Sequence, residues 1–402
     1  MLRSEERIVT THAGSLPRSQ ELLRLLVDLN EGRDVDRDAF RRRVADDLVG
    51  ILRRQRAAGI DVPSDGELPR IGFSFYVKDR MAGFGGVSSR GTLADFHRYP
   101  GWAALKAGSS RVVDEDKDMT ETATLYDAPA AVDRVVYDPE LTAAREELAL
   151  FADALAASGA SFAETFVSAA TPGIVSTTLI RTDDNPAYAD DRAYVLDLAE
   201  QLKREYDLIV GAGHVLQLDA PDLAMEREIM FQDRPLDEFL ARVELHVEAI
   251  NRACRDVPPE RVRLHVCWGN YDGPHTHDVP LEEVLPLLYR ANVGALYVAG
   301  GNHQHQHDHK AFRRHPLPDG MALVAGVIDV TTNYTEHPEV VADRIVQFAE
   351  AVGDPTRVLA APDCGFSTFA GYVMVAEDVA WTKLDVLAEG ARRASRRLFG
   401  AG

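Results

Sequence analysis

The chain of 402 residues is 46% hydrophobic and 27% charged, which is ordinary for a soluble globular protein and fits one large α/β barrel with insertions. Its formal net charge of −20 argues against nucleic acid as a partner, because phosphate binding needs clustered Lys and Arg. No apolar run could span a membrane or serve as a signal peptide, and three cysteines argue against a disulfide framework, which together predict a cytoplasmic protein without a membrane partner.

Short β-branched runs alternate with longer amphipathic segments along the chain, which is typical of parallel βα units. Eight runs are predicted as strands: Ile8–Thr11, Ile60–Pro63, Ser161–Val167, Val215–Leu218, Val262–Val266, Ala295–Val298, Ala322–Val327 and Arg357–Ala360. Helices are expected between them, for example at Asp38–Ala58, Ala143–Ala157, Ala189–Ala212, Leu236–Cys254 and Pro338–Val352. Eight units favour a closed (β/α)8 TIM barrel, with residues 1–402 as a single domain. No G-x-G-x-x-G opens a helix, which weakens a dinucleotide-binding alternative.

One connection, residues 72–130, is too long for a plain crossover between the second and third strands. It is rich in glycine and carries spaced aromatic residues. Because a loop of this length in a compact domain is usually functional, we expect an excursion or lid here.

Metal-ligand side chains stand at the carboxyl ends of two predicted strands. His265 and Cys267 are two residues apart in a strand, so their side chains point to the same face. Cys364 follows another predicted strand, and all strand ends of a barrel meet at its active-site face. One imidazole and two thiolates predict an open, catalytic zinc site with a free position. Two alternatives compete with this interpretation. A lone H-x-C motif often occurs by chance, and polar residues at strand ends often cap the helix that follows.

Seven segments spread over the chain together resemble the cobalamin-independent methionine synthase family. The chain is most similar to its short, single-barrel members, which include relatives of epoxyalkane:coenzyme M transferases. The segments are TTHAGSLPR (Thr10–Arg18), SDGELPR (Ser64–Arg70), FYVKDRMAGFGG (Phe75–Gly86), LQLDAPDLAM (Leu216–Met225), LHVCWGNYDGPH (Leu264–His275), GVIDVTTNYTEHPE (Gly326–Glu339) and PDCGFSTFAGY (Pro362–Tyr372).

The resemblance implies a (β/α)8 barrel whose zinc holds a substrate thiol as a thiolate that attacks an alkyl donor. The zinc ligands would be His265, Cys267 and Cys364, and the carboxylates of Asp219 and Glu67 would hold the polar end of the thiol. The residues expected to contact substrate are Gly14, Ser15, Arg18, Asp65, Gln217 and Asn270.

Three basic residues have predicted roles, each with an alternative explanation. His12 follows the first strand and is a candidate proton donor to the leaving group, although a packed or capping histidine is the alternative. Arg18 and Arg70 are candidates to pair with a substrate carboxylate or sulfonate. Salt bridges to Asp or Glu would also account for them.

The sixth strand end departs from the family pattern. Short members usually have a Glu there, a zinc ligand in methionine synthases, and this chain has Ala299. The following run holds His303, His305, His307 and His309, any of which could replace the ligand. The alternative is a solvated loop that tolerates histidine.

The predicted function is a zinc-dependent alkyl or methyl transferase acting on a small thiol such as homocysteine. Its partners would be that thiol and an alkyl donor, and a homo-oligomer is compatible with the sequence. Thiol addition to an epoxide is a variant of this hypothesis. A lyase or hydrolase with water at the open metal position, and a metal-binding protein without catalysis, are the other classes.

Overall fold

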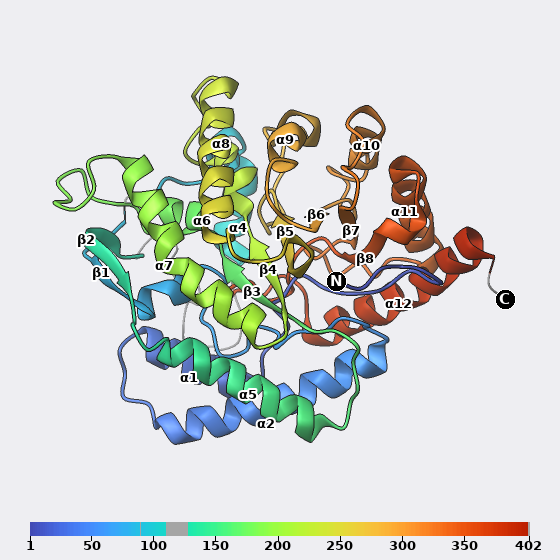
Figure 1. The fold of residues 1–402 in the computed structure, drawn as a ribbon, viewed down its shortest axis with the longest axis horizontal. Coiled ribbons are helices and arrows are strands. Elements are labelled where there is room, and N and C mark those ends of the chain that lie inside the picture. Colours follow the sequence, from blue (N-terminus) through green and yellow to red (C-terminus); the bar gives the residue numbers. More distant parts are fainter. Residues whose placement is uncertain (89, 110–127, 401–402) are drawn as a thin grey trace.

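Six parallel strands form the centre of the molecule, which a computed structural model describes for residues 1–88, 90–109 and 128–400 (Figure 1). Neighbours in the sheet are also neighbours in the chain: β3 (Phe166–Ala170), β4 (Val215–Asp219), β5 (Val262–Val266), β6 (Ala295–Val298), β7 (Ala322–Ile328) and β8 (Val358–Pro362). All residues of these strands are buried, as expected of a parallel sheet covered on both faces. The predicted α/β class is confirmed.

The two remaining predicted strands, Ile8–Thr11 and Ile60–Pro63, are extended segments joined to the sheet by single bridges. Thr10 pairs in parallel with Ala360 of β8, and Thr11 pairs in parallel with Val62. The N–H of Phe166 in β3 donates to the carbonyl oxygen of Pro63 at 3.0 Å. A longer ladder does not form, because Asp61 Oδ2 accepts the N–H of Thr10 at 2.9 Å and Pro63 has no N–H.

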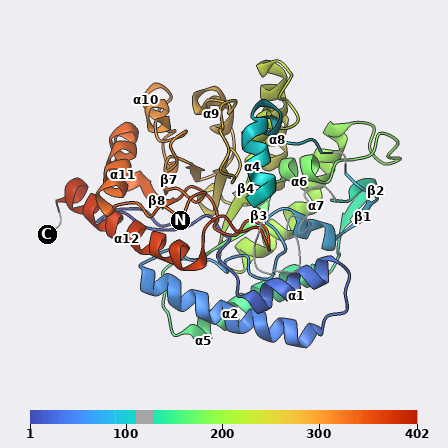
Figure 2. The same cartoon turned by 180° about the vertical axis from the view of Figure 1, so that it is seen from behind.

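Helices lie around the outside of the strands (Figures 1 and 2). Their bounds are α1 (Gln20–Asn30), α2 (Arg37–Ala58), α5 (Thr142–Ser158), α6 (Pro172–Thr178), α7 (Asp191–Gly211), α8 (Leu236–Ala253), α9 (Leu281–Leu288), α10 (Ala311–Arg314), α11 (Pro338–Val352) and α12 (Glu377–Phe399). Local signals set these bounds. In α2, for example, the Asp36 carboxylate accepts the N–H groups of Asp38 and Ala39, and Gly59 ends the helix with a φ of 83°.

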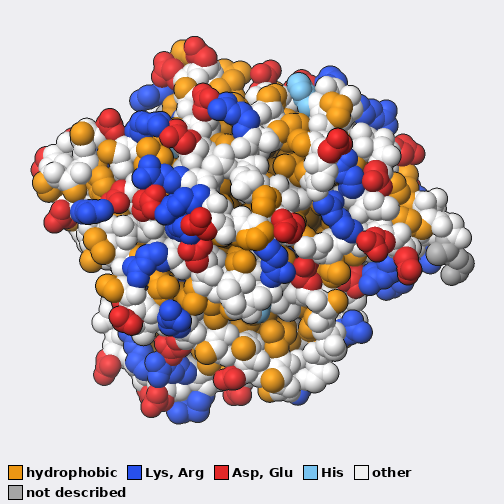
Figure 3. Space-filling view, in the orientation of Figure 1, with side chains coloured by type: hydrophobic (Ala, Val, Ile, Leu, Met, Phe, Trp, Pro, Cys, Tyr) orange, Lys and Arg blue, Asp and Glu red, His pale blue; other side chains and the backbone are white. Residues whose placement is uncertain are grey.

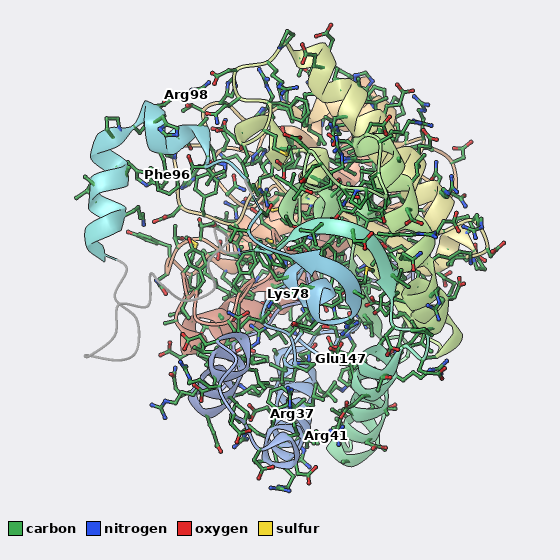
Figure 4. All side chains as sticks on the ribbon, turned by 90° about the vertical axis from the view of Figure 1, so that its left-hand side faces the viewer. Arg37, Arg41, Lys78, Phe96, Arg98 and Glu147 are labelled. Atoms are coloured by element: carbon green, nitrogen blue, oxygen red, sulfur yellow. The ribbon has the colours of Figure 1, made fainter. Side chains whose placement is uncertain are left out.

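The long connection after residue 72 contains structure of its own. It holds a 3₁₀ helix, η1 (Phe75–Asp79), strand β1 (Met81–Gly85), and helices α3 (Ala94–Arg98) and α4 (Pro100–Ser109). β1 pairs antiparallel with β2 (Ala130–Tyr137), so the excursion extends seven residues beyond its predicted end at 130. Residues 110–127 of the predicted segment lie outside the described part of the chain. Figure 4 shows Phe96 and Arg98 on α3 at the edge of the molecule.

Acidic and basic side chains are interspersed over the face seen in Figure 3. None of the helices in the described ranges carries an apolar stretch long enough to cross a bilayer.

Candidate metal centre and cavity

Three potential metal ligands from two strand ends meet in the structure. One ring nitrogen of His265, Cys267 Sγ and Cys364 Sγ all lie within 4.8 Å of one another. The two sulfur atoms are 3.8 Å apart. His265 belongs to β5, Cys267 directly follows β5, and Cys364 is the second residue after β8.

The spacing of these donors fits zinc. Two sulfurs bound to one tetrahedral zinc at about 2.3 Å lie about 3.8 Å apart, which is the separation found here. One imidazole and two thiolates are also the ligand types that zinc prefers, and a fourth position is left for another ligand.

The carboxylate of Asp219 orients the imidazole of His265. Asp219 Oδ1 lies 3.0 Å from His265 Nδ1, and His265 Nε2 lies 3.2 Å from the carbonyl oxygen of Asp363. Burial favours the neutral ring, but the contact with Asp219 outweighs it, so the pKa of His265 is raised. A carboxylate behind a ligating histidine is a common second layer of zinc sites, because it holds the ring and makes the other nitrogen more basic.

The two cysteines are a coupled pair of buried thiols. The contact with Cys364 is the main cause that lowers the pKa of Cys267 to about 7, and the nearby His265 adds to it. The pKa of Cys364 is raised well above its usual value, chiefly by the contact with Cys267 and by burial. The pair therefore gives up its first proton more easily than its second.

A cavity of about 1060 Å³ opens beside these three residues. One part of its wall consists of strand-end residues, among them Ala13, Ser15, Glu67, Asp219, His265, Cys267 and Cys364. Another part comes from the excursion and the loop after β5, including Arg90, Leu93, Phe96, Trp102, Asn270 and Tyr271. The cavity thus combines polar, metal-binding chemistry with an aromatic wall.

Glu67 is a buried carboxylate with an unused oxygen in this wall. Its Oε1 accepts from Ser168 Oγ at 2.7 Å, and its Oε2 has no hydrogen-bond partner among the described residues. Burial, followed by the nearby charge of Asp219, raises the pKa of Glu67 to about 7. Asp219 and Glu67 are therefore two carboxylates facing one cavity, which suits them to hold an ammonium group or to exchange a proton.

Gly14 allows Glu67 to approach the first loop. A Cβ atom at Gly14 would overlap Glu67 Oε1, and the φ of 134° at Gly14 is a conformation that other residues rarely adopt. Gly14 itself is not among the described residues that line the cavity, whereas its neighbour Ser15 is.

Three other predicted substrate-binding residues lie behind the wall. The buried guanidinium of Arg18 donates to the carbonyl oxygens of Glu67 at 2.7 Å and Arg70 at 2.9 Å, which ties the first loop to the second. Asp65 Oδ1 accepts the N–H of Glu67 at 3.0 Å. Gln217 Nε2 donates to Asp219 Oδ1 at 2.8 Å. These contacts position residues that line the cavity.

Asn270 lines the cavity and joins two loops. Its Nδ2 donates to the carbonyl oxygen of Gly365 at 2.8 Å and to Thr368 Oγ1 at 2.7 Å, and its buried Oδ1 has no partner among the described residues. The Oδ1 atom is therefore available to a ligand.

His12 is packed in the interior. Its Nε2 lies 2.8 Å from Gln55 Oε1, and its ring packs edge-on against Phe166 at 5.0 Å. Burial lowers the pKa of His12 to about 3, and the residue is not among the described residues that line the cavity. Its role as a proton donor stays a prediction, and its surroundings agree with the packed alternative.

Arg70 forms an ion pair, as one alternative from the sequence held. Its Nε lies 3.0 Å from Glu147 Oε2, and its Nη1 donates to the carbonyl oxygen of Ser168 at 2.8 Å. Together with Arg18, it ties the second loop to its neighbours.

Asp363, which follows β8, binds the backbone of the loop after β6, where short family members carry a glutamate and this chain has Ala299. Asp363 Oδ1 accepts the N–H of Gly301 at 2.7 Å, and Oδ2 accepts the N–H of Asn302 at 2.8 Å, so its carboxylate is committed to the loop that follows the buried Ala299. No histidine of the 303–309 run belongs to the His265 group among the described residues.

The histidine run is only partly solvated. His303 and His307 are exposed, as the solvated-loop interpretation expects, but His305 is buried and faces inward. Its Nδ1 lies 2.9 Å from Asp308 Oδ2 and its Nε2 lies 2.9 Å from Asp278 Oδ2.

The aromatic wall was missed by sequence reasoning. Phe96 and Trp102 pack at 5.0 Å between ring centres, and Trp102 packs against Tyr271 at 6.1 Å. The only signal in the sequence was the spacing of aromatic residues within a glycine-rich segment, which does not show the cavity that they face.

Known proteins resemble the chain over nearly its whole length. No protein-family model matches the chain. The methionine synthase of Thermococcus kodakarensis is 25% identical over 400 residues, which cover 98% of this chain and 95% of the relative. The methionine synthase of Sulfurisphaera tokodaii is 24% identical over 397 residues, which cover 98% of this chain and 94% of the relative.

Solved structures show the same fold over nearly the whole chain. A B12-independent methionine synthase from Shewanella sp. W3-18-1 superimposes with a TM-score of 0.70 at 20% identity, covering 98% of this chain and 100% of the other. A putative B12-independent methionine synthase from Listeria monocytogenes superimposes with a TM-score of 0.62 at 16% identity, covering 96% and 98%. The chain is therefore similar over nearly its whole length to proteins named methionine synthase and shares the fold of B12-independent methionine synthases, in line with the resemblance of its sequence motifs.

Proposed function

We propose that this chain is a zinc-dependent methyltransferase that transfers a methyl group to a small thiol such as homocysteine. The observation that carries the proposal is the convergence of His265, Cys267 and Cys364 on a cavity that Glu67 and Asp219 also line. Relatives named methionine synthase, which match this chain over nearly its whole length, support methyl transfer as the reaction.

The proposal includes a closed (β/α)8 barrel as a single domain. In a flat sheet, β5 and β8 would be three strand spacings apart, about 14 Å, yet the cysteines that follow them are 3.8 Å apart. The sheet must therefore curve strongly. The bridges of Thr10 to Ala360 and Thr11 to Val62 favour closure through the first two segments. One interior cluster also combines side chains from those segments with side chains from the strands, including Val9, Val62, Phe166, Val215, Tyr297 and Leu359.

Zinc would be held by His265, Cys267 and Cys364. When bound, zinc supplies the charge that keeps a coordinated thiol deprotonated at neutral pH, where a free thiol with a pKa of about 8.5 is mostly protonated. Asp219 would hold the imidazole of His265 in position through its Nδ1 atom.

The chain's own side chains would place the thiol substrate. Glu67 and Asp219 would bind its ammonium group, since both carboxylates line the cavity and Glu67 Oε2 has no partner among the described residues. Asn270 would contribute its Oδ1 atom, and Ser15 would contact the carboxylate of the substrate. Arg18, Asp65, Gln217 and Gly14 would act by holding these groups in place.

The excursion would act as a lid that forms the binding site for the methyl donor. A volume of about 1060 Å³ exceeds what one small amino acid fills, so a second molecule can bind beside it. Phe96 and Trp102 would offer aromatic faces against which a flat, apolar part of that second molecule could pack.

The loss of a glutamate ligand at Ala299 keeps a second function open. With a neutral side chain there, water could take the free metal position, and the same barrel would then act as a lyase or hydrolase. Addition of the thiol to an epoxide would use the first mechanism with a different alkyl donor.

A thermal-shift screen of the zinc-loaded protein tests the proposal. Homocysteine should raise the melting temperature, because a ligand that binds the native state at a hundred times its Kd stabilises it by about 2.7 kcal/mol. A rise in melting temperature with coenzyme M instead would favour addition of the thiol to an epoxide. The shift should vanish in Cys364→Ser. If no small thiol stabilises the wild-type protein at millimolar concentration, the thiol function is wrong.

A further inference from the structure

We infer that His275, Asp278 and His305 form a second site for a divalent transition metal, distinct from the cysteine-containing group. One ring nitrogen of each histidine and a carboxylate oxygen of Asp278 lie within 4.8 Å of one another. Two imidazoles and one carboxylate suit zinc, iron(II) or manganese(II). The inference does not depend on the proposed function, because none of these residues has a role in it.

The donor atoms converge on a single point. His275 Nδ1 and His305 Nε2 each lie 2.9 Å from the same oxygen, Asp278 Oδ2. Neighbouring ligands of a six-coordinate ion with bonds of about 2.0–2.1 Å are themselves about 2.9 Å apart. Both nitrogen-to-oxygen distances therefore match the spacing of adjacent ligands around one ion, and the two nitrogens lie within 4.8 Å of each other.

The other nitrogen of each ring is held as in metal-binding histidines. His275 Nε2 lies 3.0 Å from the carbonyl oxygen of Tyr271, and His305 Nδ1 lies 2.9 Å from Asp308 Oδ2. A carbonyl and a carboxylate only accept, so these nitrogens carry the ring protons and leave lone pairs facing Asp278 in the neutral rings. A ring nitrogen that donates to a carbonyl or carboxylate is the usual second layer of a metal site.

Buried carboxylate oxygens beside the site lack partners. Asp278, whose side chain is 3% exposed, has no hydrogen-bond partner at Oδ1 among the described residues. Neither carboxylate oxygen of the buried Glu228 has one. Burial and the nearby charges of Asp278 and Asp95 raise the pKa of Glu228 to about 7. A divalent ion beside these carboxyl groups would stabilise their charged form, because a buried carboxylate without a positive partner is costly.

The competing explanation is a cluster of protonated histidines without metal. Burial favours the neutral ring of His305, but Asp278 and Asp308 outweigh it and raise the pKa of His305 to about 9. Protonated rings of His275 and His305 would donate hydrogen bonds to Asp278 Oδ2, and His305 would donate a second one to Asp308 Oδ2. Among the described residues, however, they leave Asp278 Oδ1 and both carboxylate oxygens of Glu228 without hydrogen-bond partners.

The location of the site points to a structural ion. The side chains of His275 and His305 are 14% and 7% exposed, so the site is nearly closed. The ring of Tyr271, which lines the main cavity, packs 4.0 Å from His275, and Trp268, next to Cys267, packs 4.3 Å from His305. An ion there would join the loops after β5 and β6 and support the cavity wall between them.

Metal analysis of the full-length protein tests the inference. The protein is loaded with cobalt(II), dialysed, and its metal content per chain is measured. The wild-type protein should hold two equivalents of cobalt per chain. The double variant Cys267→Ser/Cys364→Ser should hold one equivalent and should lack the sulfur-to-cobalt absorption band. Adding His305→Gln or Asp278→Asn should remove the remaining equivalent. The matched control is His303→Gln, an exposed histidine of the same run, which should keep it.

The inference is overturned if the folded cysteine double variant holds no cobalt. It is equally overturned if His305→Gln holds as much as His303→Gln, which would support the protonated cluster. Should the double variant not fold, His305→Gln in the wild-type background gives the answer. This single variant should lose one equivalent of cobalt and keep the sulfur-to-cobalt absorption band. An unchanged cobalt content would contradict the second site. Failure of the thiol function would leave these results unaffected.

Discussion

Asp219 Oδ1 lies 3.0 Å from His265 Nδ1, so the neighbouring strands β4 and β5 present a carboxylate and an imidazole as one unit. The same carboxylate lines the cavity beside Glu67. Asp219 is therefore in a position to serve the metal site through His265 and the substrate directly.

Asp219→Asn should weaken zinc binding by roughly 10–100-fold, the usual effect of removing a carboxylate behind a metal-binding histidine. Competition with a chelator measures the affinity. Asp222→Asn is the matched control, because Asp222 Oδ2 lies 2.8 Å from His246 Nδ1 in a similar buried pair outside the metal group. Equal zinc affinity in Asp219→Asn and in the wild-type protein would show that Asp219 does not support zinc binding.

Glu67→Gln should stabilise the protein above pH 7 but not below pH 4. Burial and Asp219 raise the pKa of Glu67 to about 7 from its ordinary value of 4.5. Between these two values the unfolded chain loses its proton while the folded chain keeps it, so folding stability falls as the pH rises. Each pKa unit between the folded and the unfolded chain lowers the free energy of unfolding by about 1.4 kcal/mol above pH 7. The neutral amide of the Gln variant avoids this loss.

Denaturant unfolding at pH 4 and pH 8, with a chelator present, measures the effect of Glu67→Gln. The chelator is needed because a bound cation would itself lower the pKa of Glu67. A variant that is no more stabilised relative to wild type at pH 8 than at pH 4 would contradict the raised pKa.

Gly14→Ala should impair substrate binding by displacing Glu67. Its Cβ would overlap Glu67 Oε1, and the φ of 134° adds backbone strain. We expect a loss of stability of about 1–3 kcal/mol and weaker binding of the thiol with zinc content unchanged. Gly32→Ala is the control for positive φ alone, because its φ is 70° and no atom lies within 4 Å of the added Cβ. Equal thiol affinity in both variants would show that Gly14 has no such role.

Trp102→Ala should weaken binding of the methyl donor and leave thiol binding intact. Trp102 lines the cavity and packs against Phe96 and Tyr271, and an aromatic contact of this kind with the donor contributes about 0.5–1.5 kcal/mol beyond the area that it buries. Leu105→Ala on the same helix, at a residue that is 74% exposed, is the control. Steady-state KM values for donor and thiol separate the effects, and a change only in the thiol KM would contradict the proposed lid.

The strands that could be predicted best are those with buried β-branched and aliphatic runs. The predicted bounds Val262–Val266 and Ala295–Val298 are those of β5 and β6. Ser161–Val167 is wrong in its bounds, because β3 runs from Phe166 to Ala170 and its small residues carry no strand signal. The pairing of β1 with β2 was missed, since Val132–Tyr137 was assigned to no strand.

The convergence of His265, Cys267 and Cys364 could be predicted because the strand-end rule needs only strand positions and residue types. His265 and Cys267 share a face whatever the details of packing. The rule does not say which polar side chains point into the cavity. His12 and Arg18 stand at the same face of the sheet but turn toward Gln55 and toward loop carbonyl oxygens. Such choices depend on contacts between distant segments, which periodicity does not encode.

Zinc K-edge X-ray absorption, measured with and without homocysteine, tests the central claim most directly. The zinc-loaded protein should show two sulfur neighbours at about 2.3 Å, from Cys267 and Cys364, and a third when homocysteine is added. Methionine, which has no thiol, is the control and should add none. A spectrum in which zinc has no sulfur neighbours, or in which homocysteine adds only oxygen or nitrogen, would contradict thiol activation at this site.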